Sequence, residues 1–214
     1  MRGGLGLVAL AVLFPGFCCA PVTRRLPPPS DLKLSSRFPP ALNKVFTVYN
    51  TTKETYGMGC PIRENLAYTA GHLAEGGALE ALFPGKPSNK LKVLALSTTH
   101  DIALLGGEFD PVPVAKEAPL VGDKVYYRGM LSSGQQTAME GTVLGLTPHG
   151  DIVIDGWGAP GMSGSCVFDE RGEVVGDMKH IVARSDRIVR ALTVATSIVE
   201  GVPYLLKREK EDDH

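Results

Sequence analysis

Short apolar runs, separated by turn-forming residues, follow one another along the chain from residue 45 onward. Glycine, proline and aspartate gather between the runs, as in the segments 75–77, 83–85 and 169–172. We predict strands at 45–49, 57–62, 66–69, 91–95, 102–105, 124–127, 137–146, 151–154, 165–168, 173–180 and 191–196. Short strands at this rhythm favour an all-β barrel or sandwich over alternating β-α-β units.

Two short helical segments are expected beside these strands. One starts at Ser197, a suitable N-cap residue, and continues to about Lys207. The other is a single helical turn that follows His72. The charged tail at 208–214 is expected to fray.

The first 23 residues have the character of a leader and not of a folded domain. No charged residue occurs from 3 to 23, and the apolar stretch 5–17 has the length of a signal-peptide core but is short for a membrane-spanning helix. We interpret 1–23 as a signal peptide, with an uncleaved membrane anchor as the alternative. We therefore expect an exported or membrane-anchored protein, in which a proline-rich linker at 24–42 leads to a domain at 43–207.

Composition narrows the range of functions. The chain has 214 residues, of which 43% are hydrophobic and 21% are charged, and its formal net charge is −1. This length and apolar content suffice for one domain with a substantial core. The near-neutral charge gives no electrostatic signature of nucleic-acid binding, so no such partner is expected.

Only Cys60 and Cys166 remain once the two leader cysteines are set aside. They lie in opposite halves of the chain and could meet only if the halves pack together. A disulfide would be compatible with export, but we expect two buried free thiols. The sequence Asn50-Thr51-Thr52 fits a glycosylation sequon, which we interpret as a chance match.

Three candidate catalytic residues, His72, Asp101 and Ser163, each stand at the edge of a predicted strand. A serine hydroxyl is a weak nucleophile and needs a base within hydrogen-bond reach. Imidazole suits this role because its pKa of about 6.5 leaves it mostly neutral near pH 7. A carboxylate can then orient the imidazole and stabilise the imidazolium. His…Asp…Ser is one of the chain orders in which such triads are built.

Glycines surround the candidate nucleophile. Gly161 and Gly164 leave the backbone around Ser163 free to form a tight turn that directs two N–H groups into one hollow. The N–H groups of Gly161 and Ser163 are our candidates for the oxyanion hole. Ser165 is interpreted as structural. Taken alone, the segment could equally be a surface turn rich in serine and glycine.

Together these motifs resemble the chymotrypsin-like (trypsin-fold) serine peptidases, and most closely their HtrA-type (Deg) branch. The resemblance rests on the segments 57–59 (Gly-Met-Gly), 69–72 (Thr-Ala-Gly-His), 101–105 (Asp-Ile-Ala-Leu-Leu), 161–164 (Gly-Met-Ser-Gly) and 172–176 (Gly-Glu-Val-Val-Gly). It implies two perpendicular six-stranded antiparallel β-barrels with a short C-terminal helix. His72 and Asp101 would come from the first barrel and Ser163 from the second. The chain departs from the family at Gly71, where alanine is usual, and at Ser165, where a second glycine is usual.

The resemblance also suggests where a substrate side chain would bind. Trp157 occupies the position that often forms the floor of the primary specificity pocket, and Met178 and Lys179 would belong to another wall. A tryptophan there would favour apolar or small substrate side chains. The alternative is that Trp157 packs in the core.

The resemblance implies a serine endopeptidase that cleaves polypeptides through an acyl-enzyme and needs no metal or cofactor. Two alternatives share the fold. One is a virus- or phage-type protease that processes a polyprotein, and the other is a catalytically silent double-barrel binding module.

Overall fold

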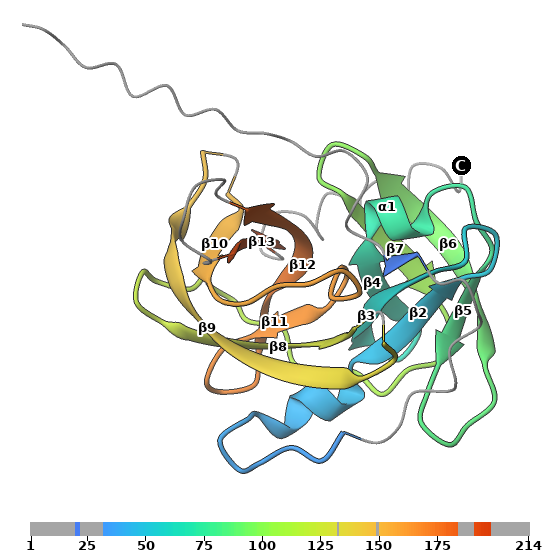
Figure 1. The fold of residues 1–214 in the computed structure, drawn as a ribbon, viewed down its shortest axis with the longest axis horizontal. Coiled ribbons are helices and arrows are strands. Elements are labelled where there is room, and N and C mark those ends of the chain that lie inside the picture. Colours follow the sequence, from blue (N-terminus) through green and yellow to red (C-terminus); the bar gives the residue numbers. More distant parts are fainter. Residues whose placement is uncertain (1–19, 22–31, 132, 149, 184–190, 198–214) are drawn as a thin grey trace, which may run out of the picture.

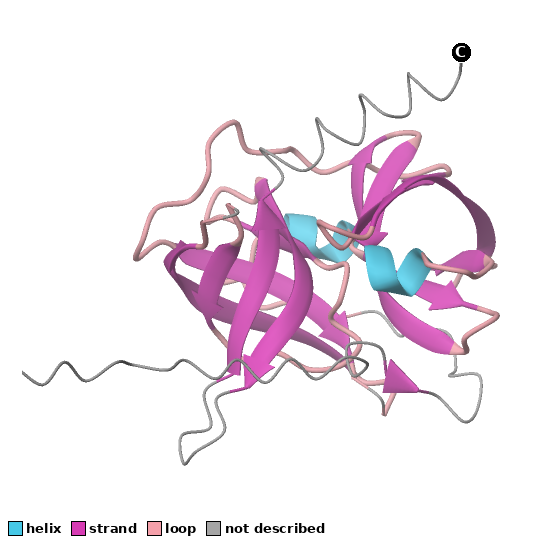
Figure 2. Ribbon diagram, turned by 90° about the horizontal axis from the view of Figure 1, so that it is seen from above, coloured by secondary structure: helices cyan, strands magenta, loops and turns pink. Residues whose placement is uncertain are grey.

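The computed structural model describes residues 20–21, 32–131, 133–148, 150–183 and 191–197. Short antiparallel strands make up most of this part, and they form two curled sheets that lie side by side (Figure 1, Figure 2). Almost all of the predicted leader and C-terminal helix, and the whole of the charged tail, lie outside the described residues.

The first sheet curls into a barrel. Its strands are β2 (Phe46–Asn50), β3 (Thr55–Arg63), β4 (Leu66–Ala70), β5 (Leu79–Leu82), β6 (Asn89–Ser97) and β7 (Ile102–Gly106). They are hydrogen-bonded in the order β3-β2-β5-β6-β7-β4, and a further pairing of β3 with β4 joins the two ends. Strand β1 (Ala20–Pro21) is added beside β3. Every residue of β4 is buried, because one face of the strand lies inside the barrel and the other packs toward the second sheet.

The second sheet is a closed barrel of six strands. They are β8 (Lys124–Met130), β9 (Gln136–Leu146), β10 (Ile152–Asp155), β11 (Cys166–Phe168), β12 (Val174–Ala183) and β13 (Ala191–Ser197). Their order around the barrel is β10-β13-β12-β11-β8-β9, and all neighbours are antiparallel. The double-barrel fold expected from the sequence is confirmed.

An apolar junction holds the two barrels together. One buried cluster contains Met58 and Tyr68 from the first barrel together with Met130 and Phe168 from the second. Each barrel also has its own interior cluster. Since burial of large side chains is the main favourable term in folding, this shared cluster fixes the barrels against each other.

A disulfide crosses the same junction. Cys60 of β3 and Cys166 of β11 are bonded, with their Cα atoms 5.1 Å apart and a sequence separation of 106. The expectation of two free thiols is therefore wrong. The reason lies in the topology, because packing brings β3 and β11 within the Cα separation that a disulfide needs.

The end of the predicted linker is folded. A 3₁₀ helix, η1 (Pro40–Lys44), begins with a proline, and its Leu42 is completely buried. Arg128 of β8, which is itself buried, donates a hydrogen bond from its guanidinium to the carbonyl of Leu42 at 3.2 Å. The packed part of the chain thus includes residues just before 43.

The remaining helices and strands match the sequence-based predictions in part. The helical turn expected after His72 is present as α1 (Gly71–Ala74), and it includes His72 itself. Strand β5 was not expected, because its sequence, Leu-Glu-Ala-Leu, lacks the β-branched and aromatic residues typical of strands.

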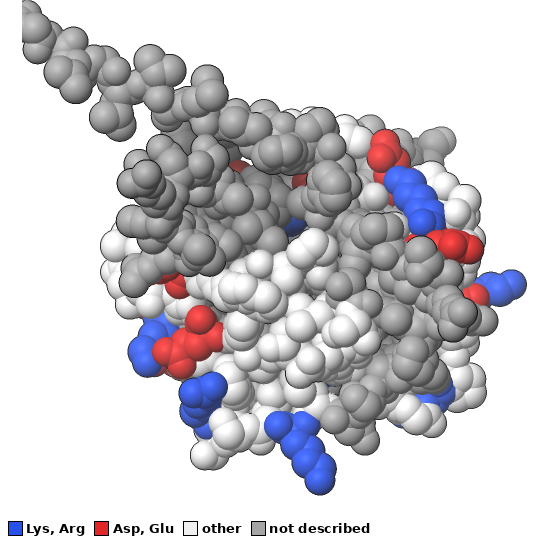
Figure 3. Space-filling view, in the orientation of Figure 1, with Lys and Arg blue, Asp and Glu red and all other residues white. Residues whose placement is uncertain are grey.

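Charged side chains lie singly or in small mixed groups near the rim of the face drawn in Figure 3, where the described residues form no extended basic patch.

Candidate active site

Helix α1 places His72 directly after β4. A buried amide holds this short helix down, since the side-chain Nδ2 of Asn50 donates to the carbonyl of Leu73 at 2.8 Å. Gly71 allows the helix to approach the start of β7 closely. A Cβ atom at Gly71 would lie 2.9 Å from the backbone nitrogen of Ile102. The departure of Gly71 from the family pattern therefore has a steric reason in this chain.

His72 and Asp101 are joined by three hydrogen bonds. The imidazole Nδ1 lies 2.8 Å from Oδ2 and 3.0 Å from Oδ1 of Asp101, and the backbone N–H of His72 donates to Oδ1 at 2.8 Å. Because an ionised carboxylate can only accept, Nδ1 carries the proton and Nε2 is the basic nitrogen of the neutral ring. Asp101 has a φ of +50°, a left-handed conformation that aspartate tolerates better than most residues.

Ser163 lies in a tight loop between β10 and β11. Two turns shape this loop, with hydrogen bonds from Met162 N–H to the carbonyl of Ala159 at 3.2 Å and from Ser165 N–H to the carbonyl of Met162 at 3.0 Å. Gly161 has a φ of +95°, and a Cβ atom there would collide with the carbonyl of Met130. Glycine is thus required at this position on both conformational and steric grounds.

The Ser163 loop is bonded to the barrel that carries His72. The carbonyl of Ser163 accepts a hydrogen bond from Met58 N–H of β3 at 2.7 Å. Gly57, the preceding residue, lies between the two sides of the junction, because a Cβ atom there would meet the side chain of Leu73 and would lie 2.7 Å from the carbonyl of Ser163. Residues 163 and 73 therefore approach the same glycine from opposite barrels.

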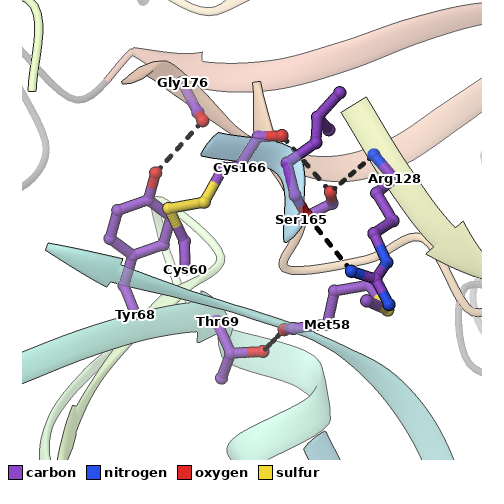
Figure 4. The surroundings of a disulfide bond; sticks show 9 residues. Met58, Cys60, Tyr68, Thr69, Arg128, Ser165, Cys166 and Gly176 are labelled. Carbon is purple, nitrogen blue, oxygen red and sulfur yellow. Dashed lines mark hydrogen bonds between the residues drawn. A yellow bond between two sulfur atoms is a disulfide. The ribbon is translucent and has the colours of Figure 1, made fainter. Parts of the chain in front are cut away.

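Ser165 has a structural place in the second barrel. Its hydroxyl accepts a hydrogen bond from Arg128 N–H at 3.1 Å and donates to the carbonyl of Cys166 at 3.2 Å (Figure 4). The side chain is fully buried. A serine at this position thus links β8 to β11, which a glycine could not do.

The three residues expected to bind substrate have different surroundings in the structure. Trp157 is 44% exposed on the loop before Ser163, so its interpretation as core packing is wrong, and its carbonyl accepts a hydrogen bond from the Tyr127 hydroxyl at 2.8 Å. Met178 is buried in the interior cluster of the second barrel. Lys179 forms an ion pair with Asp151 at 2.7 Å and is almost fully buried.

Asp177 was missed by the sequence analysis. It lies in the middle of β12 and is completely buried. Burial raises the pKa of its carboxyl well above the usual value, the negative charge of Asp101 raises it further, and the charges of His72 and Lys179 lower it. The available signal was an acidic residue within the apolar run Val-Val-Gly-Asp-Met at 174–178.

Comparison with known families assigns the chain. Residues 57–176 match the family described as the trypsin-like peptidase domain, which spans the segments that carry His72, Asp101 and Ser163. The chain belongs to this family. Membership agrees with the double barrel and with the resemblance inferred from the sequence motifs.

Solved structures of similar fold include HtrA-type proteases. A serine endoprotease from Yersinia pestis superimposes with a TM-score of 0.70 at 17% identity, covering 81% of this chain and 65% of that chain. The HtrA-type protease AlgW with a tripeptide gives a TM-score of 0.69 at 16% identity, covering 78% of this chain and 60% of that chain. An inactive form of Rv3671c from M. tuberculosis, with a serine replaced by alanine, gives a TM-score of 0.66 at 18% identity. The match covers 84% of this chain and 97% of that chain.

This trypsin-like peptidase chain spans less than two thirds of the first two of these structures. None of the curated proteins matches its sequence significantly.

Within residues 20–21, 32–131, 133–148, 150–183 and 191–197, no helix has the length and apolar character that crossing a bilayer requires. The same residues contain no cluster of side chains suited to a metal ion.

Proposed function

We propose that the chain is a serine endopeptidase with Ser163 as the nucleophile, His72 as the general base and Asp101 as the orienting carboxylate. The observation that carries this proposal is the bonding of Asp101 to both the ring Nδ1 and the backbone N–H of His72, at 2.8 to 3.0 Å. Such bonding directs the basic Nε2 away from Asp101. Family membership supports the same function, and so does the tight turn at Ser163 in the second barrel, which is flanked by glycines with positive φ.

The reaction would proceed in two steps. Nε2 of His72 takes the proton of the Ser163 hydroxyl while Oγ attacks the carbonyl carbon of the substrate, and the imidazolium then gives that proton to the departing amine. Water hydrolyses the resulting acyl-enzyme with His72 again as the base. Asp101 stabilises the imidazolium in both steps. The His72 and Asp101 side chains are 28% and 26% exposed, so the pair is partly shielded from water but open on one side.

The oxyanion of each tetrahedral intermediate would be bound by backbone N–H groups of Gly161 and Ser163. The turn that presents them is anchored by the hydrogen bond from Met130 N–H to the carbonyl of Gly161 at 3.3 Å. This bond holds the Gly161 carbonyl toward β8. Preorganised donors of this kind contribute about 3 kcal/mol each to lowering the barrier.

We also propose that the protein works outside the cytoplasm, either secreted or held by its N-terminal segment. The interbarrel disulfide supports export, since such bonds form and persist in oxidising compartments. Fractionation of producing cells tests this. Recovery of the chain in the cytoplasm with reduced cysteines would contradict it.

Labelling with a fluorophosphonate probe tests the catalytic assignment. We expect the purified full chain to be labelled, and Ser163→Ala and His72→Ala to remain unlabelled. Ser133→Ala is the matched control, because its hydroxyl lies on an exposed turn, where it accepts a hydrogen bond from Gln135 N–H. A folded wild-type chain that does not react with the probe would favour a binding module of the same fold.

A further inference from the structure

Asp177 is a buried acidic residue that the proposed mechanism does not use. Its side chain is 0% exposed. Neither carboxylate oxygen has a hydrogen-bond partner among the residues that the structure describes. An ionised carboxylate in such a place would lose its hydration without gaining a donor in return, so the neutral acid is the favoured form.

The backbone on either side of Asp177 is bonded to the candidate active site. The carbonyl of Gly176 accepts a hydrogen bond from the Tyr68 hydroxyl at 3.1 Å, and Tyr68 belongs to β4, which leads directly to His72 (Figure 4). The carbonyl of Met178 accepts a hydrogen bond from Gly164 N–H at 2.7 Å, next to Ser163. Asp177 therefore stands at the point where β12 meets both halves of the site.

Several titratable groups act on Asp177, and they come from different elements. Asp101 precedes β7, His72 comes from α1, Tyr68 from β4, and Lys179 from β12 itself. Asp101 is bonded to His72, and Lys179 is bonded to Asp151, so the imidazole and the ammonium each already have a carboxylate partner. Cys166, the β11 residue opposite Asp177, is in the disulfide and does not titrate.

We propose that Asp177 is a positioning residue, an uncharged carboxylic acid that packs behind the Asp101–His72 pair and acts through it. This rests on the proposed function. While Asp177 is neutral, it adds no negative charge beside the Asp101 carboxylate. When Asp177 loses its proton at alkaline pH, a second negative charge appears there. That charge repels the neighbouring Asp101 carboxylate and weakens its hold on the imidazole, so that His72 is less well oriented as a base.

The tendency of the group to stay protonated is consistent with its surroundings. Burial raises the pKa of the Asp177 carboxyl well above its usual value, and Asp101 raises it further. Desolvation by burial raises the pKa of the Tyr68 hydroxyl well above its usual value, and the charge of Asp177, once that carboxyl is ionised, raises it further. Tyr68 therefore remains a neutral donor to Gly176 in the pH range where Asp177 titrates.

The first test is an NMR titration of His72 in the full chain, comparing the wild type with Asp177→Asn. The substitution replaces a neutral acid by a neutral amide of the same shape, so the pKa of His72 should change by less than about 0.3 unit. A fall of about 0.5 unit or more would show that an anion had been removed, and would overturn the proposal. Glu140→Gln is the control, since it removes one surface carboxylate that is paired with Lys124.

The second test follows activity at alkaline pH. We expect peptidase activity of the wild type to decline as Asp177 ionises, and Asp177→Asn to keep its activity to higher pH. Identical alkaline profiles would contradict the proposal. Should the wild type be inactive throughout, the NMR titration still decides the state of Asp177, so that outcome counts against the proposed function alone.

Infrared spectroscopy gives a third measurement that needs no activity and does not depend on the variant being well folded. The wild type should show the carbonyl band of a protonated carboxylic acid near neutral pH, and this band should disappear as the pH is raised. Its absence at neutral pH would mean that Asp177 is ionised there, contrary to the proposal.

Discussion

Gly71 begins the helix that carries His72, at a place without room for a methyl group. A Cβ atom there would press on the backbone of Ile102 and Asp101. We expect Gly71→Ala to lower the free energy of unfolding by about 1 to 3 kcal/mol, as overpacking does in a tight site. It should also reduce kcat/KM, because α1 must move away from Asp101. Thermal unfolding and a peptide-cleavage assay measure the two effects. Gly145→Ala is the control, since nothing lies within 4 Å of its added Cβ.

Asp101 determines which nitrogen of His72 carries the proton. Asp101→Asn keeps the shape of the side chain, but its amide can donate to Nδ1 and so favours the wrong tautomer. We expect kcat to fall by about 10,000-fold while the fold is retained. Steady-state kinetics and circular dichroism together check this. A variant that cleaves peptides at a rate near that of the wild type would remove Asp101 from the proposed triad.

At the scale of elements, the Asp177 side chain of β12 makes the free energy of unfolding depend on pH. Because burial raises the pKa of this carboxyl, the folded chain holds the proton more tightly than the unfolded chain does. The stability that Asp177 contributes is complete below the ordinary carboxyl pKa of about 3.9 and is lost as the pH rises toward the folded-state pKa. Asp177→Asn removes this dependence.

Urea unfolding of Asp177→Asn and of the wild type tests that dependence. We expect the variant to gain stability relative to the wild type as the pH is raised from about 5 to about 8. The gain should be absent from Glu140→Gln. A stability difference between wild type and Asp177→Asn that stays constant over this range would mean that Asp177 does not titrate differently in the folded chain.

The elements that the sequence predicted well are those whose pattern is local. Alternating or fully apolar runs next to turn formers located strands such as β4 and β7, and the glycines around Ser163 indicated a tight turn. Strand β5 and helix η1 could not be predicted, because their conformations depend on pairing and packing with distant residues. The steric role of Gly71 and the burial of Asp177 could not be predicted from the sequence for the same reason. Both follow from the approach of segments that are far apart in the chain.

At the scale of the whole molecule, the disulfide joins the barrels beside the residues proposed to act together. It closes a sequence separation of 106 residues, which strongly restricts the unfolded chain. We expect loss of the bond in Cys60→Ala/Cys166→Ala to cost about 2 to 5 kcal/mol of stability. Unfolding in the presence and absence of a reductant measures this. If reduction left the unfolding transition of the wild type unchanged, the bond would not be formed in solution.

The buried amide of Asn50 has a consequence for producing the protein. Its Nδ2 is bonded to the carbonyl of Leu73, and its Oδ1 accepts from the N–H groups of Thr52 and Lys53. A sugar attached to Nδ2 could not fit in the folded chain, although Asn50-Thr51-Thr52 reads as an acceptor site. Glycosylation of Asn50 during synthesis in a eukaryotic secretory pathway would therefore prevent helix α1, which carries His72, from packing in its native position. A bacterial periplasm would supply the disulfide without that hazard.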